Sequence, residues 1–261
     1  MSNILFNIKN LSFSISNKEI LKSLSLKIYK GDYLSIIGPN GGGKTTLIKC
    51  LIKINKSPQN KIFFNEVAIE KISQKELASQ ISYVPQITEN VFPFTAKEFL
   101  MLARYPHLSR FSSITTKDKN AVEEAFNITK TKYLSNRFIN TLSGGEKQMI
   151  FIAAAFAQGG DIMLLDEPAT FLDPKHEHDV YKILNRIHTQ TNKTIVTVTH
   201  NINSAILNSK KIVLIKNGKV EFYGESQKIL ENNVLEKAYN KKFNFIKYPG
   251  SDKQIIIPEI I

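Results

Sequence analysis

The sequence predicts an α/β fold in which helices cover a largely parallel sheet. Three features of the chain support this fold class. Short apolar runs alternate with helix-like segments in the second half, an apolar run ends at a glycine-rich cluster near residue 38, and the segment from about 95 to 160 has mostly helical spacing. Alternation of this kind is typical of parallel strands, because each crossover to the next strand usually contains a helix.

The first 85 residues combine strand and helix signals. Leu34–Ile37 is an apolar run that stops at a Gly/Pro/Asn cluster, as a buried strand entering a loop does. The segment Thr45–Ile54 carries apolar residues at helical spacing, which predicts a helix. The following residues, 55–60, include a proline and predict a break.

The middle of the chain contains two recognisable helix starts. Thr95 and Glu98 form a capping-box pattern, in which the hydroxyl and the carboxylate each satisfy a free backbone N–H. Ser143 begins a second helix that runs through an apolar stretch to Ala157 and stops at two glycines.

Strands and helices alternate again after residue 160. Asn217-Gly218 is a strong hairpin-turn signal. The tail from about residue 234 to 261 predicts a short helix and then irregular apolar and basic sequence, with no role assigned. The predicted strands are 162–165, 194–198 and 212–216, and the predicted helices are 174–191 and 202–208.

The composition excludes a mainly disordered chain and a collagen-like chain. The chain has 261 residues with 42% hydrophobic and 22% charged, as in an ordinary folded protein. The net charge of +12 is spread along the chain and only four basic residues are arginine, so we interpret it as a lysine-rich surface and expect no nucleic-acid partner. The single cysteine, Cys50, excludes an intramolecular disulfide and is expected to be a small buried residue.

The sequence shows neither a signal peptide nor a membrane span. The N-terminus lacks a charged region followed by an apolar one. The longest apolar run, 149–157, is far shorter than the roughly 20 residues that cross a bilayer. If the protein acts at a membrane, we expect another chain to supply the spans.

A glycine-rich segment after the first predicted buried strand matches the phosphate-binding loop pattern. Its glycines let consecutive backbone N–H groups surround a polyanion, and the helix that follows adds its positive dipole end. Lys44 can reach the β- and γ-phosphates, and the Thr45 hydroxyl can bind Mg²⁺. The alternative is a glycine-rich turn without a ligand. The segment comprises Gly38, Pro39, Asn40, Gly41, Gly42, Gly43, Lys44 and Thr45.

Two acids end the predicted strand 162–165. Adjacent residues of a strand point to opposite faces, so Asp166 and Glu167 are expected to do different work. Asp166 suits Mg²⁺, directly or through water. Glu167 would orient or deprotonate a water near the γ-phosphate. The alternative is an acidic strand end that caps the next turn.

A second glycine motif, Leu142–Glu146, has the features of another anion site. Ser143 is an N-cap residue, Gly144 and Gly145 expose backbone N–H groups, and a helix dipole follows. Since a phosphate loop already exists, this second site needs another ligand or the ligand of another subunit.

With these motifs the chain resembles, over nearly its whole length, the ATP-binding subunits of ABC transporters. The sequence LSGGE matches the family's signature motif, and Gln86 after Tyr83-Val-Pro resembles its Q-loop glutamine. Thr170–Asp173 resembles the D-loop, and His200 resembles the switch histidine. The resemblance implies an ATPase domain over 1–234 with a P-loop NTPase core, an N-terminal antiparallel β subdomain and an inserted helical subdomain over about 88–160. Residues 235–261 form a tail of unknown role.

The resemblance also implies roles for individual residues. Glu167, His200 and Gln86 would be catalytic, and Mg²⁺ would be held by Thr45, Gln86 and Asp166. ATP would contact the phosphate loop, Thr46, Ser143, Gly144, Gly145 and Asp173. Two copies would pair head to tail, so that each ATP lies between the phosphate loop of one copy and the signature motif of the other.

Partners follow from the same resemblance. We expect a membrane permease that docks near Gln86 to His107, at the cytoplasmic face of the membrane, and an extracytoplasmic substrate-binding protein that acts through the permease. The stretch Phe94–His107 resembles the segment after the Q-loop in the ATP-binding subunits of importers of iron–siderophore complexes, haem and cobalamin. Those subunits often read GRYPH there, and this chain has Ala103 in place of the glycine. Alternatives are a zinc or manganese importer ATPase and a soluble non-transport ABC ATPase.

Some positions depart from the family pattern. The residue expected to stack on adenine falls on Ile15, with Phe13 two positions earlier, and these share a face if the strand is regular. Asn201 follows the switch histidine where Asp is common. We interpret the remaining histidines as surface or packing residues: His107, His176, His178 and His188.

Overall fold

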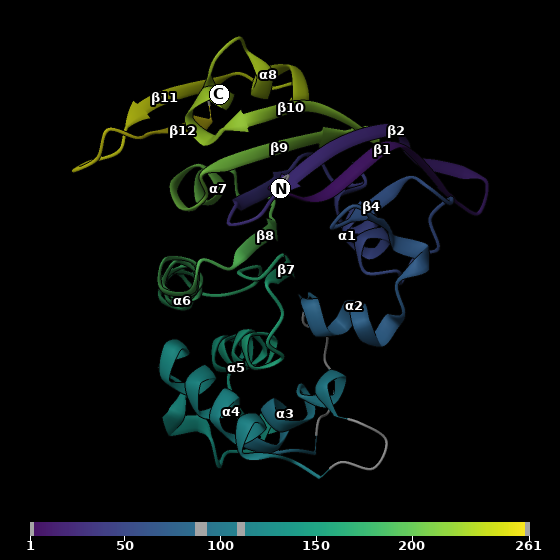
Figure 1. Ribbon diagram of the computed structural model, residues 1–261. Coiled ribbons are helices and arrows are strands. Elements are labelled where there is room, and N and C mark those ends of the chain that lie inside the picture. The colour runs from purple at the N-terminus through teal and green to yellow at the C-terminus, as the bar shows by residue number, and fades with distance from the viewer. Residues whose placement is uncertain (1–2, 87–92, 109–112, 259–261) are drawn as a thin grey trace. The chain divides into compact units, whose positions relative to one another are not determined.

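The computed structural model describes residues 3–86, 93–108 and 113–258 of the chain (Figure 1). The chain divides into two compact units. The first comprises Met1–Ile72 and Val196–Ile261, and the second comprises Ser73–Ile195.

The first unit contains an antiparallel sheet with strand order β2-β1-β4-β5. The strands are β1 (Ile4–Ile15), β2 (Lys18–Tyr29), β4 (Ile62–Phe64) and β5 (Val67–Ala68). Phe6 pairs with Phe64 in register, and their rings pack with centroids 5.0 Å apart. This sheet confirms the antiparallel β subdomain.

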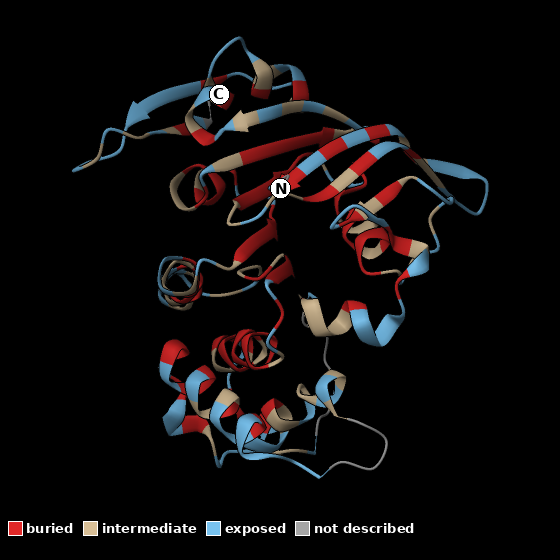
Figure 2. Cartoon of the chain, in the orientation of Figure 1, coloured by how far each residue is buried: buried red, intermediate tan, exposed pale blue. Residues whose placement is uncertain are grey.

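A second group of strands in this unit carries the buried core. β3 (Tyr33–Ile37) runs parallel to β9 (Lys211–Lys216), and β10 (Lys219–Glu225) returns antiparallel. Strand β8 (Thr194–Val198) begins in the second unit and ends in the first. All residues of β3 and β8 are buried, as Figure 2 shows, which is typical of strands covered on both faces.

Helices α1 (Lys44–Leu51) and α7 (Ile202–Asn208) follow the ends of β3 and β8. α1 buries Cys50 completely, and burial raises the pKa of this thiol to about 12. A short 3-10 helix, η1 (Ile69–Lys71), follows β5. These helices confirm the α/β architecture.

The C-terminal tail contains more regular structure than the sequence predicts. After η5 (Ser226–Leu230), the expected short helix is present as α8 (Val234–Tyr239). The prediction of irregular sequence beyond it is wrong, because β11 (Phe243–Lys247) and β12 (Gln254–Pro258) form an antiparallel hairpin. The loop 248–253 contains the turn signal Pro249-Gly250, but the run Ile255–Ile257 lacks polar alternation, so the second strand has no usual strand pattern.

The second unit pairs two parallel strands with a group of helices. β6 (Ile81–Val84) lies in register with β7 (Ile162–Asp166), from Ile81 opposite Ile162 to Val84 opposite Leu165. The longer elements are α2 (Gln74–Gln80), α3 (Ala96–Leu102), α4 (Thr116–Thr129), α5 (Gly144–Ala157) and α6 (Pro174–Thr191), and the 3-10 turns are η2 (Tyr105–His107), η3 (Lys132–Leu134) and η4 (Ile139–Thr141).

Reciprocal capping boxes start three of these helices. Thr95 with Glu98 begins α3, as predicted, Thr115 with Asp118 begins α4, and Ser143 with Glu146 begins α5. Each box satisfies two of the N–H groups that a helix leaves unpaired at its start. The polar residues at these positions therefore define where the helices begin.

Arg104 joins several parts of the second unit. Its Nε donates to Asp118 Oδ1 at 3.0 Å, and its Nη1 donates to the carbonyl of Ala157 at 2.6 Å. Hydrogen bonds from Thr115 and the Arg104 guanidinium lower the pKa of Asp118 to about 2. The Nε2 of His107 lies 2.5 Å from the carbonyl of Gln158. The segment around η2 is thereby fastened to the end of α5.

In the described ranges, no helix is long and apolar enough to cross a bilayer.

Candidate functional site

The predicted phosphate loop lies in the first unit, between β3 and α1. Gly38 has φ 145°, Gly41 has φ 75° and Gly43, the residue before α1, has φ 103°. At Gly38 a side chain is impossible without displacement, because a Cβ there would lie 1.9 Å from the carbonyl oxygen of Ile215 in β9. The loop therefore folds tightly against the end of β9.

Lys44 reaches back into this loop from the first turn of α1. Lys44 is only 6% exposed. Its Nζ donates to the carbonyl of Gly38 at 2.8 Å and to the carbonyl of Pro39 at 3.0 Å. The ammonium is therefore inside the turn that the glycines form. A glycine-rich loop that holds a lysine ammonium is suited to a polyphosphate.

His200 lies in the same unit, just after β8. The N–H of Thr199 donates to the carbonyl of Ile36 at 3.1 Å, which fixes the end of β8 to β3. Asn201 caps α7 by accepting from the N–H of Ser204 at 3.0 Å. His200 is exposed between these two anchored neighbours, so the ends of β3 and β8 hold its backbone while its ring remains accessible.

The second unit brings Gln86 and Glu167 together. β6 and β7 run parallel in register, so the residues that follow them meet at one edge of the pair. The Nε2 of Gln86 donates to Glu167 Oε2 at 3.3 Å, and the Thr170 hydroxyl donates to the same oxygen at 3.0 Å. These two bonds orient the carboxylate of Glu167.

The two adjacent acids differ in environment, but not through strand alternation. β7 ends at Asp166, which is 3% exposed, whereas Glu167 has left the strand with φ 51°. The expectation that both acids follow strand alternation is therefore wrong, since Glu167 adopts a left-handed backbone conformation that is uncommon for residues other than glycine. Burial, together with the charge of Asp166, raises the pKa of Tyr83 to about 12.

The signature motif forms the start of α5. The hydroxyl of Ser143 accepts from the N–H of Glu146 at 3.2 Å, and Glu146 Oε2 accepts from the N–H of Ser143 at 2.9 Å. The bond from Ser143 N–H lowers the pKa of the Glu146 carboxyl. Gly144 and Gly145 therefore occupy the first turn of a well-capped helix, as expected.

Asp173 is the N-cap of α6. Its Oδ1 accepts from the N–H of His176 at 2.9 Å, and its Oδ2 lies 2.7 Å from His176 Nδ1. These bonds lower the pKa of the Asp173 carboxyl. Nearby, Phe171 has φ 63° and is 92% exposed. Sequence reasoning gave His176 no individual part here, although its spacing of three from an N-cap Asp was the available signal.

The predicted residues thus fall into two sets. Within the first unit the structure carries the phosphate loop and His200, and within the second it brings Gln86 to Glu167 beside Asp166 and carries the signature and D-loop residues. Phe13 and Ile15 both lie in β1, where the β1–β2 register shifts between Phe13 and Ser14, and a contact of either residue with adenine stays a prediction. Of the predicted permease-docking stretch, residues 87–92 lie outside the described residues.

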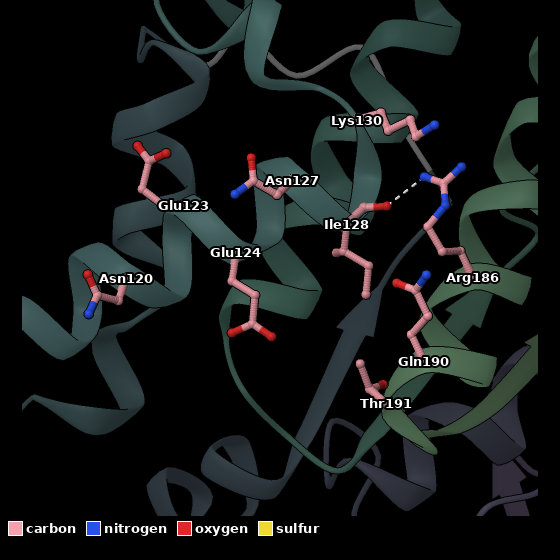
Figure 3. Close-up of a pocket in the computed structure, with 9 residues that line it drawn as sticks. All are labelled: Asn120, Glu123, Glu124, Asn127, Ile128, Lys130, Arg186, Gln190 and Thr191. Atoms are coloured by element: carbon pink, nitrogen blue, oxygen red, sulfur yellow. Dashed lines mark hydrogen bonds between the residues drawn. The ribbon is translucent and has the colours of Figure 1, made fainter.

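Other features of the second unit lie apart from these predicted residues. A polar hollow of about 900 Å³ is lined by α4 and α6, where Arg186 donates to the Ile128 carbonyl at 2.7 Å (Figure 3). His188 is buried, and its Nδ1 lies 3.0 Å from the carbonyl of Lys193. No group of three or more His, Cys, Asp or Glu that could hold a metal occurs among the residues that the structure describes.

The family model described as ABC transporter matches residues 21–170. The chain is similar to the iron(3+)-hydroxamate import ATP-binding protein FhuC of Bacillus subtilis (strain 168). The two are 30% identical over 249 residues, which cover 95% of this chain and 93% of that protein.

Two solved structures extend these similarities to the fold. The first is a metal-chelate type ABC transporter in an inward-facing conformation, with a TM-score of 0.85 and 26% identity, covering 99% of this chain and 98% of that one. The second is the ATP-binding cassette MJ0796, a dimer in a post-hydrolysis state bound to ADP and Pi. It has a TM-score of 0.72 and 26% identity, covering 85% of this chain and 99% of that one.

Proposed function

This chain belongs to the ABC transporter family as an ATP-binding, ATP-hydrolysing subunit, and from that premise we propose that the transporter it powers imports a metal chelate such as an iron–siderophore complex. The observation that carries the cargo class is the Arg104–His107 segment, which resembles the corresponding segment of such importers. In this structure the segment has a fixed position on α5, because the side chains of Arg104 and His107 both form hydrogen bonds with carbonyls at the end of that helix. The similarity to an iron(3+)-hydroxamate import protein supports the same class.

The phosphate loop is proposed to hold the triphosphate of ATP. Its N–H groups would surround the phosphates, Lys44 would contact the β- and γ-phosphates in exchange for its present bonds to loop carbonyls, and Thr45 and Thr46 would extend the cradle. Thr45, Asp166 and Gln86 offer hydroxyl, carboxylate and amide oxygens, which are the hard donors that Mg²⁺ prefers. Mg²⁺ would neutralise charge that develops on the phosphate oxygens.

Hydrolysis is proposed to use a water that Glu167 activates. The water oxygen bonds to the γ-phosphorus, the bond from that phosphorus to its bridging oxygen breaks, and the proton passes to the Glu167 carboxylate. Gln86 and Thr170 support this role because both donate a hydrogen bond to Glu167 Oε2 and so orient the carboxylate. His200, exposed on anchored backbone, would donate a hydrogen bond to the γ-phosphate, and ADP and phosphate leave.

The working ATPase is proposed to be a head-to-tail pair of copies. Ser143, Gly144 and Gly145 form a second anion site at the start of α5, which the phosphate loop of the same copy does not require. Asp173 would contribute from the D-loop. Phe171, two residues before Asp173, is 92% exposed and would be accessible to the second copy. The dimeric MJ0796 cassette supports a pairing of two copies.

Docking to the permease is proposed near Gln86 to His107, at the cytoplasmic face of the membrane. Two apolar side chains of this stretch face solvent, since Leu102 is 53% and Tyr105 is 73% exposed. Their exposure suits an apolar contact with a membrane subunit. An extracytoplasmic binding protein would deliver the chelate through that permease, and nucleic acid is not a proposed partner.

The test is co-purification followed by transport. The tagged protein is recovered from membranes of its own cell in mild detergent, and the subunits that accompany it are identified and reconstituted in liposomes. We expect a polytopic permease in stoichiometric amount and ATP-dependent uptake of a ferric chelate. Uptake of free Zn²⁺ or Mn²⁺ instead would replace the proposed cargo, and recovery without any membrane subunit would favour a soluble ABC ATPase.

A further inference from the structure

The imidazole of His176 lies against the main chain of the signature motif. A Cβ added to Gly145 would lie 2.2 Å from His176 Cδ2, 2.3 Å from its Cγ and 2.8 Å from its Cβ. Real Cβ atoms do not approach other atoms that closely, so the ring fills the space that a side chain at Gly145 would need. Residue 145 must therefore be glycine for the His176 ring of α6 to pack in this position.

The same imidazole is held by Asp173. A carboxylate only accepts hydrogen bonds, so the 2.7 Å contact requires His176 Nδ1 to donate to Asp173 Oδ2. Asp173 Oδ1 also accepts from the backbone N–H of His176 at 2.9 Å, which fixes the carboxylate from two sides. The His176 side chain is 26% exposed and that of Asp173 is 58% exposed, so water reaches this bond mainly from the Asp173 side.

His176 thus contacts both elements that the proposed dimer presents to its partner. It packs on Gly145 of the signature motif and binds Asp173 of the D-loop. Its charge, when it is protonated, also lies close enough to Glu146 to favour that carboxylate. His178, two residues further along α6, is exposed and lies off this face of the helix.

We propose that His176 is a positioning residue that holds the D-loop aspartate and the signature turn in one fixed geometry, so that both engage the nucleotide bound to the other copy. This inference rests on the head-to-tail arrangement of the proposed function. His176 acts through Asp173 and Gly145 and touches no nucleotide of its own copy. Its loss should therefore impair hydrolysis at the partner's phosphate loop and leave its own phosphate loop unaffected.

A complementation assay separates these two effects. One copy, the loop copy, carries Ser143→Arg and keeps its phosphate loop, while the other, the signature copy, carries Lys44→Met and keeps its signature motif. Neither copy alone has a complete site, and in their mixture each heterodimer has one composite site while the homodimers have none. His176→Ala is then placed in either copy, and phosphate release is measured at saturating ATP.

We expect His176→Ala in the signature copy to lower the activity of the mixture at least about tenfold, because an error of about 1 Å in positioning can cost up to a hundredfold. In the loop copy the same change should alter activity by less than about twofold. Equal losses in both copies would mean a general folding effect and overturn the proposal, as would no loss in either. An inactive mixture of the two unmodified copies would instead overturn the head-to-tail arrangement itself, and the proposal with it.

Two further variants of the signature copy separate the hydrogen bond from the ring. His176→Asn keeps an amide N–H near the position of Nδ1, and His176→Phe keeps a ring without a donor. We expect the Asn variant to recover activity to within about threefold of His176 and the Phe variant to remain impaired. Full activity of the Phe variant would overturn the part assigned to the bond with Asp173.

Discussion

Gly38 offers a sharp test of the phosphate-loop geometry. In Gly38→Ala the new Cβ would lie 1.9 Å from the Ile215 carbonyl oxygen and 2.9 Å from its carbon. Both are backbone atoms, so no side-chain rotation can remove the overlap. The φ of 145° is in addition a conformation that essentially only glycine adopts.

The expected loss of stability follows from these two effects. Backbone strain of this kind costs about 1–3 kcal/mol, and forcing atoms into a packed region costs about 1–3 kcal/mol more. We therefore expect Gly38→Ala to lose about 2–6 kcal/mol of unfolding free energy. Gly41→Ala is the matched control, because its φ is 75° but nothing lies within 4 Å of the added Cβ. It should lose only about 1–2 kcal/mol, the cost of a left-handed conformation.

The assay is urea unfolding without nucleotide, followed by circular dichroism. Nucleotide is left out because binding would add its own stabilisation. Since two compact units need not unfold together, hydrogen exchange of peptides from β3 and α1 assigns the loss to the first unit. Equal losses for Gly38→Ala and Gly41→Ala would refute the claim that the Ile215 carbonyl excludes a side chain at Gly38.

Four further outcomes are expected. Glu167→Gln should abolish steady-state phosphate release while an ATP-dependent dimer accumulates on gel filtration, and a variant that stays monomeric with ATP and Mg²⁺ would contradict the proposed pairing. Lys44→Met should abolish ATP binding measured by fluorescent-nucleotide titration with an unchanged circular dichroism spectrum. Arg104→Met should cost about 3–5 kcal/mol in urea unfolding, because it leaves Asp118 buried without its cation. Asp118 has its pKa lowered from 3.8 to about 2, so its contribution is present above about pH 4 and lost as pH falls toward 2, and Asp118→Asn should flatten that part of the stability profile.

Elements with strong end signals were predictable from the sequence. The helix 174–191 was predicted with its observed ends, because Asp173 is an N-cap and Pro174 suits the first helical position. The strand 194–198 and the helix 202–208 also have the predicted bounds. The β11–β12 hairpin was missed because the run Ile255–Ile257 in its second strand lacks the polar alternation of a half-buried strand, although Pro249-Gly250 marks the turn between the strands.

For the candidate site, sequence motifs predicted residues but not geometry. The motif around Asp166 and Glu167 suggested strand alternation, and only the structure reveals that Glu167 turns into a left-handed conformation beside Gln86. His176 and Gly145 lie about thirty residues apart in the sequence, and the packing of α6 on α5 brings them into contact. No local sequence pattern predicts this contact. Local signals thus identify candidates, and tertiary packing decides which of them touch.

Asn203 in α7 binds the C-terminal tail and limits which substitutions the tail can accept during evolution. The side-chain amide donates to the carbonyl of Ile256 at 2.9 Å and accepts from its N–H at 2.8 Å, so it binds peptide groups that any residue except proline provides. Ile256 itself is buried in an apolar cluster, whereas Ile257 on the other face is exposed. A slip of one residue would reverse these faces. In descendants of this chain, mutations should therefore accumulate at positions 255 and 257, while the amide at 203 and an apolar side chain at 256 are inherited together.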